Sequence, residues 1–362
     1  MNELKTKVIN GKFIAKRMAG LQRFAYEVVC EMDDLSKKGE TELIIPKGSS
    51  HGLSLKNIKI VQYGRIRSMK EGSLLSHLWE LLDLPFYLLT HKSTCINLNY
   101  TAPPLRTGFV FLHDINYRTH PQYFTGVNKI HIKLHYLSYW YVCKFAKHIF
   151  TDSECTKSMV VKVYKVLPQR ITVVGCGWQH YERVDFDDSI YDVFQELKGR
   201  PFFFSLGSLD VHKNISWVLA AAKRNQNYLF CITGEESVNK EKYVDIPSNV
   251  IFTGRLNDSH VKTLMRDCKA FIFPSFCEGF GIPPLEALSV GARIIVSNAT
   301  CLPEIYEDSA VYIDPNNPNV DMDELLMIET EDPQRILDKY SWGKTAALIF
   351  ETVDDVLMQE RK

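Results

Sequence analysis

Residues 273–291 read FPSFCEGFGIPPLEALSVG and decide how the chain is interpreted. A strand ends at 273–275, a loop with two glycines follows, and Pro283 and Pro284 then begin a helix. Proline in a first helical turn costs no hydrogen bond, and we expect this helix to run to about Gly291. The free backbone N–H groups at the start of such a helix form an anion-binding site. The segment therefore predicts a strand–loop–helix unit that binds a diphosphate.

Two glutamates flank this predicted site. The backbone N–H groups of Phe280, Gly281 and Ile282 are expected to face the diphosphate, because glycine lets the backbone approach a ligand closely. Glu286, early in the helix, can accept hydrogen bonds from a diol such as ribose. Glu278, in the loop, can bind sugar hydroxyls or face a developing positive charge. Taken alone, the two carboxylates fit an exposed first-turn and an exposed loop glutamate equally well, but the surrounding pattern favours a ligand site.

Short β-rich segments alternate with helical stretches along the whole chain, which is the pattern of parallel α/β proteins. The first set of strands is expected at residues 7–13, 42–48, 58–64, 94–99, 108–114, 148–153 and 171–177. The second set is expected at residues 202–208, 228–234, 250–254, 270–275, 293–298 and 311–315. The stretch 180–201 between the sets turns acidic and is interpreted as the linker and a first helix. A length of 362 residues also favours two domains, and we expect two Rossmann-like domains that face each other across a cleft.

The formal net charge of zero conceals an asymmetry along the chain. Of 43 basic and 43 acidic residues, 25 basic and 13 acidic ones fall in residues 1–170, a net charge of +12 that leaves −12 for the remainder. Such an asymmetry predicts two domains with different partners and an N-terminal half suited to an anionic surface. Drift in surface composition is the alternative.

The expected compartment is the cytoplasm. The nine cysteines are scattered and form no C-x-x-C pair, which is typical of reduced thiols and not of a disulfide framework or a zinc site. The N-terminal segment lacks the apolar core of a signal peptide, and no apolar run approaches the roughly 18 residues of a membrane-spanning helix. We therefore expect a cytoplasmic protein that at most sits on a membrane surface.

The two glutamates, set in E-G-F-G-I-P-P-L-E-A-L, resemble the E-x7-E signature of the family-4 retaining glycosyltransferases of GT-B fold. The similarity covers about the whole chain and is most specific between residues 202 and 315. Other segments resemble further landmarks of that family, namely residues 18–24, 112–114 with 120–121, 150–154, 207–214, 302–304, 314–315 and 340–342. The fold this resemblance implies is α/β with GT-B architecture. Its parts would be an acceptor-side domain over 1–182, a nucleotide-sugar-binding domain over 183–340 and a C-terminal helix over 341–362 that packs back on the first domain.

The resemblance also implies roles for individual residues. Gly20 would let the backbone meet the donor diphosphate, and His113 would contact the transferred sugar. Lys213 would place a positive charge against the departing diphosphate. Many relatives have an arginine in this phosphate-binding segment, where this chain has Ser208 or His212. A protonated His212 or Arg255 is a candidate for the second phosphate cation.

These matches predict a retaining, metal-independent hexosyltransferase. The nucleotide-diphosphate-sugar is its donor substrate, and no cofactor is expected. Catalysis is assigned to Glu278, His113 and Lys213, and donor binding to Gly20, Ser208, Lys213, Arg255, Phe280, Gly281, Ile282 and Glu286. No D-x-D arrangement stands where it could bridge a diphosphate through a metal, since Asp187 and Asp188 lie in the linker. The expected acceptor is a glycan or a lipid-diphosphate-linked oligosaccharide of bacterial surface-polysaccharide assembly.

Two other classes of function share these features. A GT-B enzyme that epimerises or hydrolyses a nucleotide-sugar needs no acceptor surface, and a non-catalytic binding protein needs no conjunction of both glutamates with Lys213. Nucleic-acid binding is disfavoured because the basic residues are dispersed and no recognised module is present. Residues 129–147, rich in lysine and aromatic side chains, are either a core helix with a solvated basic face or an amphipathic surface for anionic lipid headgroups. Arg65, Arg67 and Lys70 would belong to the same face.

Overall fold

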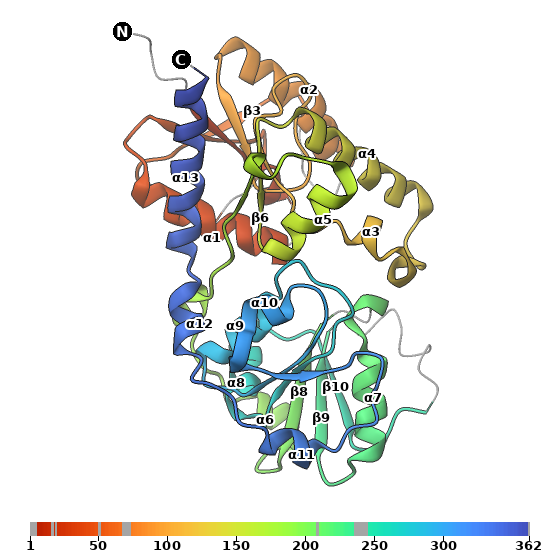
Figure 1. Ribbon diagram of the computed structural model, residues 1–362. Helices are drawn as coiled ribbons and strands as arrows, with labels where there is room; N and C mark the ends of the chain where they lie inside the picture. Colours follow the sequence, from red (N-terminus) through yellow and green to blue (C-terminus); the bar gives the residue numbers. More distant parts are fainter. Residues whose placement is uncertain are drawn as a thin grey trace. The chain divides into compact units, whose positions relative to one another are not determined.

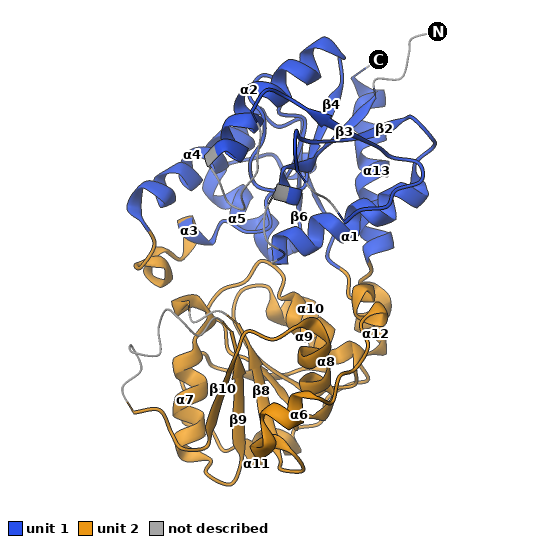
Figure 2. Cartoon of the chain, turned by 180° about the vertical axis from the view of Figure 1, so that it is seen from behind, with its two compact units in different colours: residues 1–117, 128–176, 342–362 blue, residues 118–127, 177–341 orange. Residues whose placement is uncertain are grey.

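The computed structural model describes residues 6–15, 18, 20–49, 52–66, 74–207, 210–234 and 245–360. These residues divide into two compact units (Figures 1 and 2). Unit 1 comprises residues 1–117, 128–176 and 342–362, and unit 2 comprises residues 118–127 and 177–341. Each unit is built on one parallel sheet, which confirms the α/β class with two Rossmann-like domains.

Unit 1 contains a seven-stranded sheet in the order β3-β2-β1-β4-β5-β6-β7. Its strands are β1 (Lys7–Asn10), β2 (Thr41–Pro46), β3 (Lys59–Tyr63), β4 (Thr94–Asn97), β5 (Phe109–Phe111), β6 (His148–Thr151) and β7 (Ile171–Val173). Its helices are α1 (Gly20–Leu35), α2 (Leu74–Thr90), α3 (Asn116–Thr119, shared with unit 2), α4 (Lys129–Phe145), α5 (Glu154–Tyr164) and α13 (Trp342–Gln359), with short 3-10 turns η1 (Gly11–Ala15) and η3 (Pro168–Arg170). The central strands are buried on both faces, as parallel strands covered by helices must be.

The C-terminal helix α13 packs on α1 within unit 1. The Phe24 ring of α1 meets the Trp342 ring of α13 edge-on, with 5.7 Å between their centroids. Lys7 Nζ lies 2.7 Å from Asp354 Oδ1 and ties the first strand to the same helix. The expectation that the terminal helix returns to the first domain is therefore confirmed.

Unit 2 contains a six-stranded sheet in the order β10-β9-β8-β11-β12-β13. Its strands are β8 (Phe202–Leu206), β9 (Leu229–Thr233), β10 (Val250–Gly254), β11 (Phe271–Phe273), β12 (Ile294–Ser297) and β13 (Val311–Ile313). Its α-helices are α6 (Ile190–Val193), α7 (Ile215–Arg224), α8 (Asp258–Asp267), α9 (Ile282–Ser289), α10 (Leu302–Tyr306), α11 (Met322–Met327) and α12 (Gln334–Lys339). Its 3-10 turns are η2 (Pro121–Phe124), η4 (Gln179–Arg183), η5 (Gln195–Leu197), η6 (Val211–Lys213) and η8 (Glu307–Ser309).

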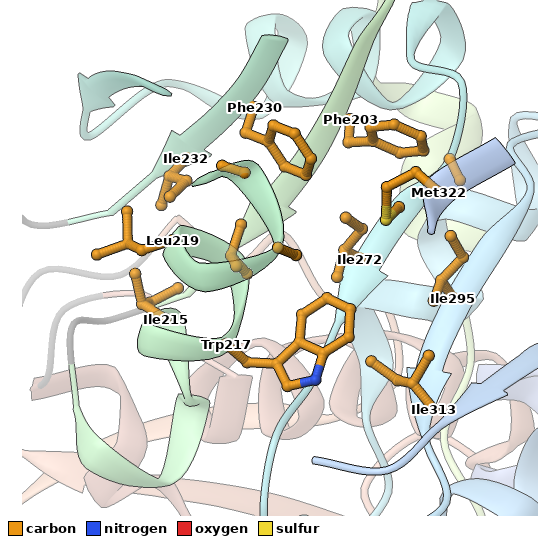
Figure 3. Close-up of a cluster of buried hydrophobic side chains, with 14 of the residues drawn as sticks. Phe203, Ile215, Trp217, Leu219, Phe230, Ile232, Ile272, Ile295, Ile313 and Met322 are labelled. Atoms are coloured by element: carbon orange, nitrogen blue, oxygen red, sulfur yellow. The ribbon is translucent and has the colours of Figure 1, made fainter. Parts of the chain in front are cut away.

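The core of unit 2 lies between its sheet and α7. Trp217 of α7 is 2% exposed and packs among side chains from β8, β9, β11, β12 and β13 (Figure 3). Its indole Nε1 donates to the carbonyls of Asp314 and Asn317 at 3.1 Å each. Trp217 therefore fastens the segment after β13 to the core as well as filling it.

All thirteen expected strands are present, each within a few residues of its predicted bounds. The helix expected to reach Gly291 ends at Ser289 with Val290 as its C-cap, and Gly291 follows in the left-handed region with a φ of +79°. The main boundary between the units falls after residue 176, whereas the sequence placed it after residue 182. Residues 118–127, which the sequence assigned to the first domain, group with unit 2.

Candidate active site

The start of α9 in unit 2 has the geometry expected of an anion site. Gly281 is the residue before the helix and has a φ of +89°, a conformation that favours glycine. A Cβ at this position would lie 2.7 Å from Leu302 Cδ2, so packing excludes a larger residue as well. The hydroxyl of Tyr306 donates to the Gly281 carbonyl and holds the turn. Ile282 then opens the helix with its first N–H groups unpaired within it.

Glu278 and Lys213 form an ion pair across the carboxyl edge of the unit 2 sheet. Lys213 Nζ donates to Glu278 Oε1 at 2.7 Å, and the side chains are 22% and 13% exposed. Lys213 follows β8 in the turn η6, while Glu278 follows β11, the neighbouring strand. The pair is thus partly open to solvent at the edge where α/β sheets bind ligands.

The backbone around both residues is fixed by further contacts. The Glu278 N–H donates to Thr300 Oγ1 at 3.1 Å, and Lys213 Nζ lies 5.3 Å from the centre of the Phe273 ring. Asn214, next to Lys213, is in the left-handed region and donates from its amide to the carbonyls of Pro274 and Pro315. These hydrogen bonds fix the position of the turn that carries Lys213 at the edge of the sheet.

Glu286 is held by His180, a residue to which the sequence gave no role. His180 Nε2 donates to Glu286 Oε1 at 2.8 Å, and both side chains are nearly buried. His180 comes from η4, which precedes the unit 2 sheet, so the two residues are 106 positions apart. No spacing rule connects positions so distant, and only the tertiary fold reveals the pair.

Two aromatic residues of the segment 118–127 border the same region of unit 2. The rings of Tyr123 and Phe276 stack with centroids 4.3 Å apart and planes 3° apart. Phe124 stacks on His212 at 5.1 Å, and the Phe276 N–H donates to the His212 carbonyl at 2.8 Å. The sequence gave no sign that this segment belongs beside the turn predicted to bind phosphate.

His212 is disfavoured as the second phosphate cation. Burial, and next to it the charge of Lys213, lowers the pKa of His212 below its ordinary value, so the ring is neutral near pH 7. Its Nδ1 is buried and has no hydrogen-bond partner among the described residues. Arg255 follows β10, is exposed, and forms no ion pair within the described part of the chain. Arg255 therefore remains the better candidate.

The structure places the remaining donor-site candidates as follows. The Phe280 ring is buried edge-on against Tyr340 at 5.0 Å, so only its backbone is free to meet a ligand. Ser208 lies outside the described residues. Gly20 is the first residue of α1 in unit 1, and a Cβ there would meet nothing within 4 Å among the described residues. Packing within unit 1 therefore does not require glycine at position 20.

His113 lies in unit 1 just after β5 and is 6% exposed. Its Nδ1 donates to Asp152 Oδ2 at 2.7 Å, and its Nε2 donates to the Leu98 carbonyl at 3.1 Å. The Phe24 ring meets it edge-on at 4.7 Å. Both ring nitrogens are thus engaged inside unit 1, which the sequence did not indicate.

The ionisation of His113 predicts a pH-dependent stability. Burial lowers the pKa of His113, but the charge of Asp152 and the hydrogen bond to it, together with the Leu98 carbonyl and the charge of Asp114, leave the pKa raised. A raised folded pKa stabilises the protein fully below the unfolded value of about 6.5, and this contribution is lost as the pH rises through the folded pKa. We expect the difference in free energy of unfolding between the wild type and His113→Asn to shrink between pH 6 and pH 9. Urea unfolding at several pH values measures it.

An Asp152→Asn variant is the control for this prediction, because it removes the charge that raises the pKa of His113. In the Asp152→Asn background, His113→Asn should change stability by an amount that no longer falls with pH. A pH-independent difference in the wild-type background would contradict the assignment.

No group of three or more His, Cys, Asp or Glu side chains is arranged to hold a metal ion in the part of the chain that the structure describes. Asp187 and Asp188, the adjacent carboxylates of the linker, contact basic side chains. Asp187 Oδ2 lies 3.1 Å from His260 Nε2, and Asp188 Oδ1 lies 2.8 Å from an Arg266 nitrogen.

Comparison with known proteins shows what the chain is similar to. Residues 188–336 match the family described as glycosyl transferases group 1. The chain is 26% identical over 234 residues to the O-antigen chain mannosyltransferase RfbU of Salmonella typhimurium, a match that covers 63% of this chain and 62% of that relative. The chain thus spans about three fifths of the length of this relative.

Two solved structures share the fold over nearly the whole chain. Sucrose-phosphate synthase from Thermosynechococcus elongatus superposes with a TM-score of 0.74 at 11% identity, covering 98% of this chain and all of that one. Anabaena HepE in complex with UDP-glucose superposes with a TM-score of 0.66 at 12% identity, covering 96% of this chain and 99% of that one. Residues 188–336 thus resemble the group 1 glycosyltransferases, and the fold of the chain is the GT-B fold of these solved structures.

Proposed function

We propose that the chain is a retaining glycosyltransferase. It would move a hexose-type sugar from a nucleotide-diphosphate-sugar to a glycan or lipid-linked oligosaccharide in polysaccharide biosynthesis. The observation that carries this proposal is the Lys213–Glu278 ion pair, 2.7 Å long, at the sheet edge where α9 also begins. The name of the relative supports a mannosyl donor, and the UDP-glucose complex of HepE supports a nucleotide-diphosphate-sugar as the donor class.

In this mechanism the diphosphate is bound by fixed positive charge. The unpaired N–H groups at the start of α9 and the Lys213 ammonium would face the phosphate oxygens, with Arg255 as the second cation. Charge on the leaving diphosphate increases as the bond to the sugar breaks. Interactions that strengthen as this charge develops raise the rate of the chemical step.

Glu278 and the leaving phosphate would both act at the transferred sugar. A carboxylate at this place can accept hydrogen bonds from sugar hydroxyls and stabilise positive charge that develops at the anomeric carbon. In a retaining reaction without a covalent enzyme intermediate, the departing phosphate oxygen takes the proton of the acceptor hydroxyl on the face from which it leaves. The acceptor oxygen then bonds to the anomeric carbon on that same face. This scheme needs no metal ion. His113 of unit 1 is proposed to contact the transferred sugar, which requires its Nε2 to exchange the Leu98 carbonyl for a sugar hydroxyl.

Glu286 would accept hydrogen bonds from the ribose diol, and His180 is a positioning residue for it. Replacing His180 by phenylalanine removes a charge-assisted hydrogen bond of about 1.5–3 kcal/mol. We expect the donor KM to rise by about tenfold to a hundredfold while kcat changes little, because ribose binding is the same in the ground and transition states. Steady-state kinetics with varied donor separate the two constants.

The conservative variant His180→Gln controls for this prediction, since its amide can donate to the same carboxylate oxygen. We expect it to recover much of the donor affinity. A fall in kcat with an unchanged donor KM in His180→Phe would argue against the positioning role.

The proposed setting is the cytoplasmic side of a membrane that carries the acceptor. All nine cysteines are free thiols, as in proteins of a reducing compartment. Burial raises the pKa of Cys143 to about 12, so this thiol is protonated and unreactive at neutral pH.

Incubating the full chain with labelled nucleotide-diphosphate-sugars tests the proposal. Mannose and glucose donors would be supplied with and without a lipid-diphosphate-linked acceptor. Sugar transfer that requires the acceptor supports the proposal. Conversion of the donor without an acceptor would indicate an epimerase or hydrolase instead, and binding without turnover would indicate a non-catalytic binding protein.

A further inference from the structure

Two helices of unit 1 expose an unusual amount of apolar surface. Of the 22 large hydrophobic side chains that are exposed among the described residues, six belong to α2 and five to α4. Those of α2 are Leu75, Leu78, Leu81, Leu82, Phe86 and Leu89, and those of α4 are Ile130, Leu134, Leu137, Trp140 and Phe145. Single exposed apolar residues need no explanation, but a contiguous group of them marks an interaction site.

On each helix these side chains form a stripe. Leu75, Leu78, Leu82, Phe86 and Leu89 recur at intervals of three and four residues, which places them on one face of α2. The opposite face holds Leu84 and Leu88, which are buried in a cluster with side chains of β1, β2 and β4. The α2 helix is therefore apolar on both faces, and its outer face has no partner among the described residues.

The α4 helix repeats the pattern with lysines added. Ile130, Leu134 and Leu137 follow the helical spacing along its outer face, and Lys133 and Lys144 are exposed beside them. Lys144 Nζ lies 5.0 Å from the centre of the Trp140 ring. Long basic side chains that run along apolar rings are typical of segments at a membrane interface, where the charge reaches the headgroups.

The two stripes lie on the same side of unit 1. Helix α2 connects β3 to β4 and α4 connects β5 to β6, and both connections cross the sheet in the same direction. Right-handed crossovers therefore place both helices on one face of the sheet, opposite α1. Figures 1 and 2 show α2 and α4 on one flank of unit 1. We call their exposed apolar and basic side chains the α2–α4 face.

The charge of the α2–α4 face has one sign. Helix α4 contains no Asp or Glu. The two acidic residues of α2 point elsewhere: Glu80 is buried against Lys12 at 2.6 Å, and Asp83 Oδ2 accepts the Ile66 N–H at 2.9 Å. No acidic side chain of either helix is exposed on this face, so its basic residues can meet anions.

A surface cavity of about 470 Å³ lies beside the C-terminal ends of both helices. Tyr141 and Phe145 of α4 line it, together with Ser93, which follows α2. Arg106 lines it as well, is half-buried, and forms no ion pair among the described residues. An unpaired guanidinium in a partly apolar cavity suits a phosphate headgroup with its acyl chain alongside.

We propose that the α2–α4 face binds an anionic phospholipid bilayer, with both helices lying in the plane of the interface. No helix among the described residues combines the length and the apolar content needed to cross a bilayer. A second copy of the chain fits less well, because a two-fold interface would bring one basic face against another. Apolar stripes with flanking lysines match the requirements of interfacial helices: burial of leucine and aromatic side chains among acyl chains, and attraction of lysine to anionic headgroups.

This inference does not rest on the proposed transferase activity, and it fails separately from it. A chain that binds vesicles but transfers no sugar would retain the α2–α4 face and lose the proposed function. A chain that transfers sugar to a soluble acceptor but ignores vesicles would show the reverse.

Vesicle co-sedimentation of the full chain tests the proposal. The probes are vesicles of phosphatidylcholine alone and vesicles of phosphatidylcholine with phosphatidylglycerol added, whose anionic headgroups attract basic residues. We expect the wild type to pellet with the anionic vesicles. Leu134→Glu with Leu137→Glu should lower the bound fraction by at least about tenfold, and both side chains are exposed, so folding is spared. The matched control is Leu35→Glu on α1, an exposed leucine on the opposite face of the sheet, which should bind as the wild type does.

A charge variant separates the electrostatic contribution to vesicle binding from the apolar one. Lys133→Gln should weaken binding to anionic vesicles by roughly fivefold, the equivalent of about 1 kcal/mol per basic residue, and should not affect the weak binding to neutral vesicles. Equal pelleting with neutral and anionic vesicles, or unchanged binding by the double glutamate variant, would overturn the proposal. A wild-type protein that binds no vesicles and is a dimer would also overturn it, if Leu134→Glu with Leu137→Glu converts the dimer to a monomer. The α2–α4 face would then be a contact between two copies of the chain.

Discussion

Lys213→Ala is expected to lower kcat for sugar transfer by about a hundredfold to a thousandfold, the usual cost of removing one charge-stabilising donor from an active site. The Lys213 ammonium is the fixed positive charge at the sheet edge beside α9, and it stands 2.7 Å from Glu278. Its loss would leave the negative charge on the leaving diphosphate less stabilised and Glu278 without its cation. Steady-state transfer with a labelled donor measures the effect.

Lys213→Arg is the control for charge. Arginine keeps the cation but changes its shape and reach, so we expect an intermediate rate. Both variants should unfold at nearly the wild-type temperature, because the side chain is partly exposed and buries no core surface. Wild-type turnover by Lys213→Ala would remove Lys213 from the mechanism.

Trp217→Ala is expected to lower the free energy of unfolding of unit 2 by about 3–5 kcal/mol. The side chain is 2% exposed in the core of Figure 3, so its removal leaves a cavity that the surrounding strands cannot fill. The carbonyls of Asp314 and Asn317 also lose their donor. Urea unfolding followed by circular dichroism measures the loss.

Two variants make this prediction specific. Trp140→Ala is the matched control, because Trp140 is 46% exposed and its removal should change stability by less than about 0.5 kcal/mol. Trp217→Phe keeps most of the packing but not the two hydrogen bonds, so its stability should fall between the other two. A Trp217→Ala protein as stable as Trp140→Ala would contradict the assigned core.

The sequence was sufficient for those features that depend on local pattern. The thirteen strands follow from short β-rich runs with turn residues at their ends, and the start of α9 follows from a glycine with prolines two and three positions later. A local cap has the same origin, since Ser153 directly before α5 accepts the Thr156 N–H at 3.2 Å. In each case residues close in sequence determine the conformation.

Features that join distant segments could not be predicted. The His180–Glu286 bond spans 106 positions, and the Tyr123–Phe276 stack brings a segment of the N-terminal half into unit 2. The engagement of both His113 nitrogens by Asp152 and Leu98 depends on how neighbouring strands align. Apolar periodicity in residues 129–147 also left open which face of the helix is buried, and the structure places Tyr139 and Val142 inward and Leu134 and Leu137 outward.

The excess of basic residues in the N-terminal half of the sequence lies in the unit that carries the α2–α4 face. The excess of basic residues falls in the half of the chain that contains α2 and α4, whose outer faces are apolar and lack exposed carboxylates. A uniform basic surface would have no such apolar stripes. The α2–α4 face therefore gives the net charge of +12 over residues 1–170 a specific role to test.

The most direct test of the central claim is the anomeric configuration of the first product, followed by proton NMR while the full chain acts on a nucleotide-diphosphate-mannose donor and a lipid-linked acceptor. The mechanism built on Lys213, Glu278 and Glu286 predicts a new glycosidic bond with the configuration of the donor, formed by the wild type and nearly abolished in Lys213→Ala. A product of inverted configuration, or release of free sugar with no product on the acceptor, would contradict it.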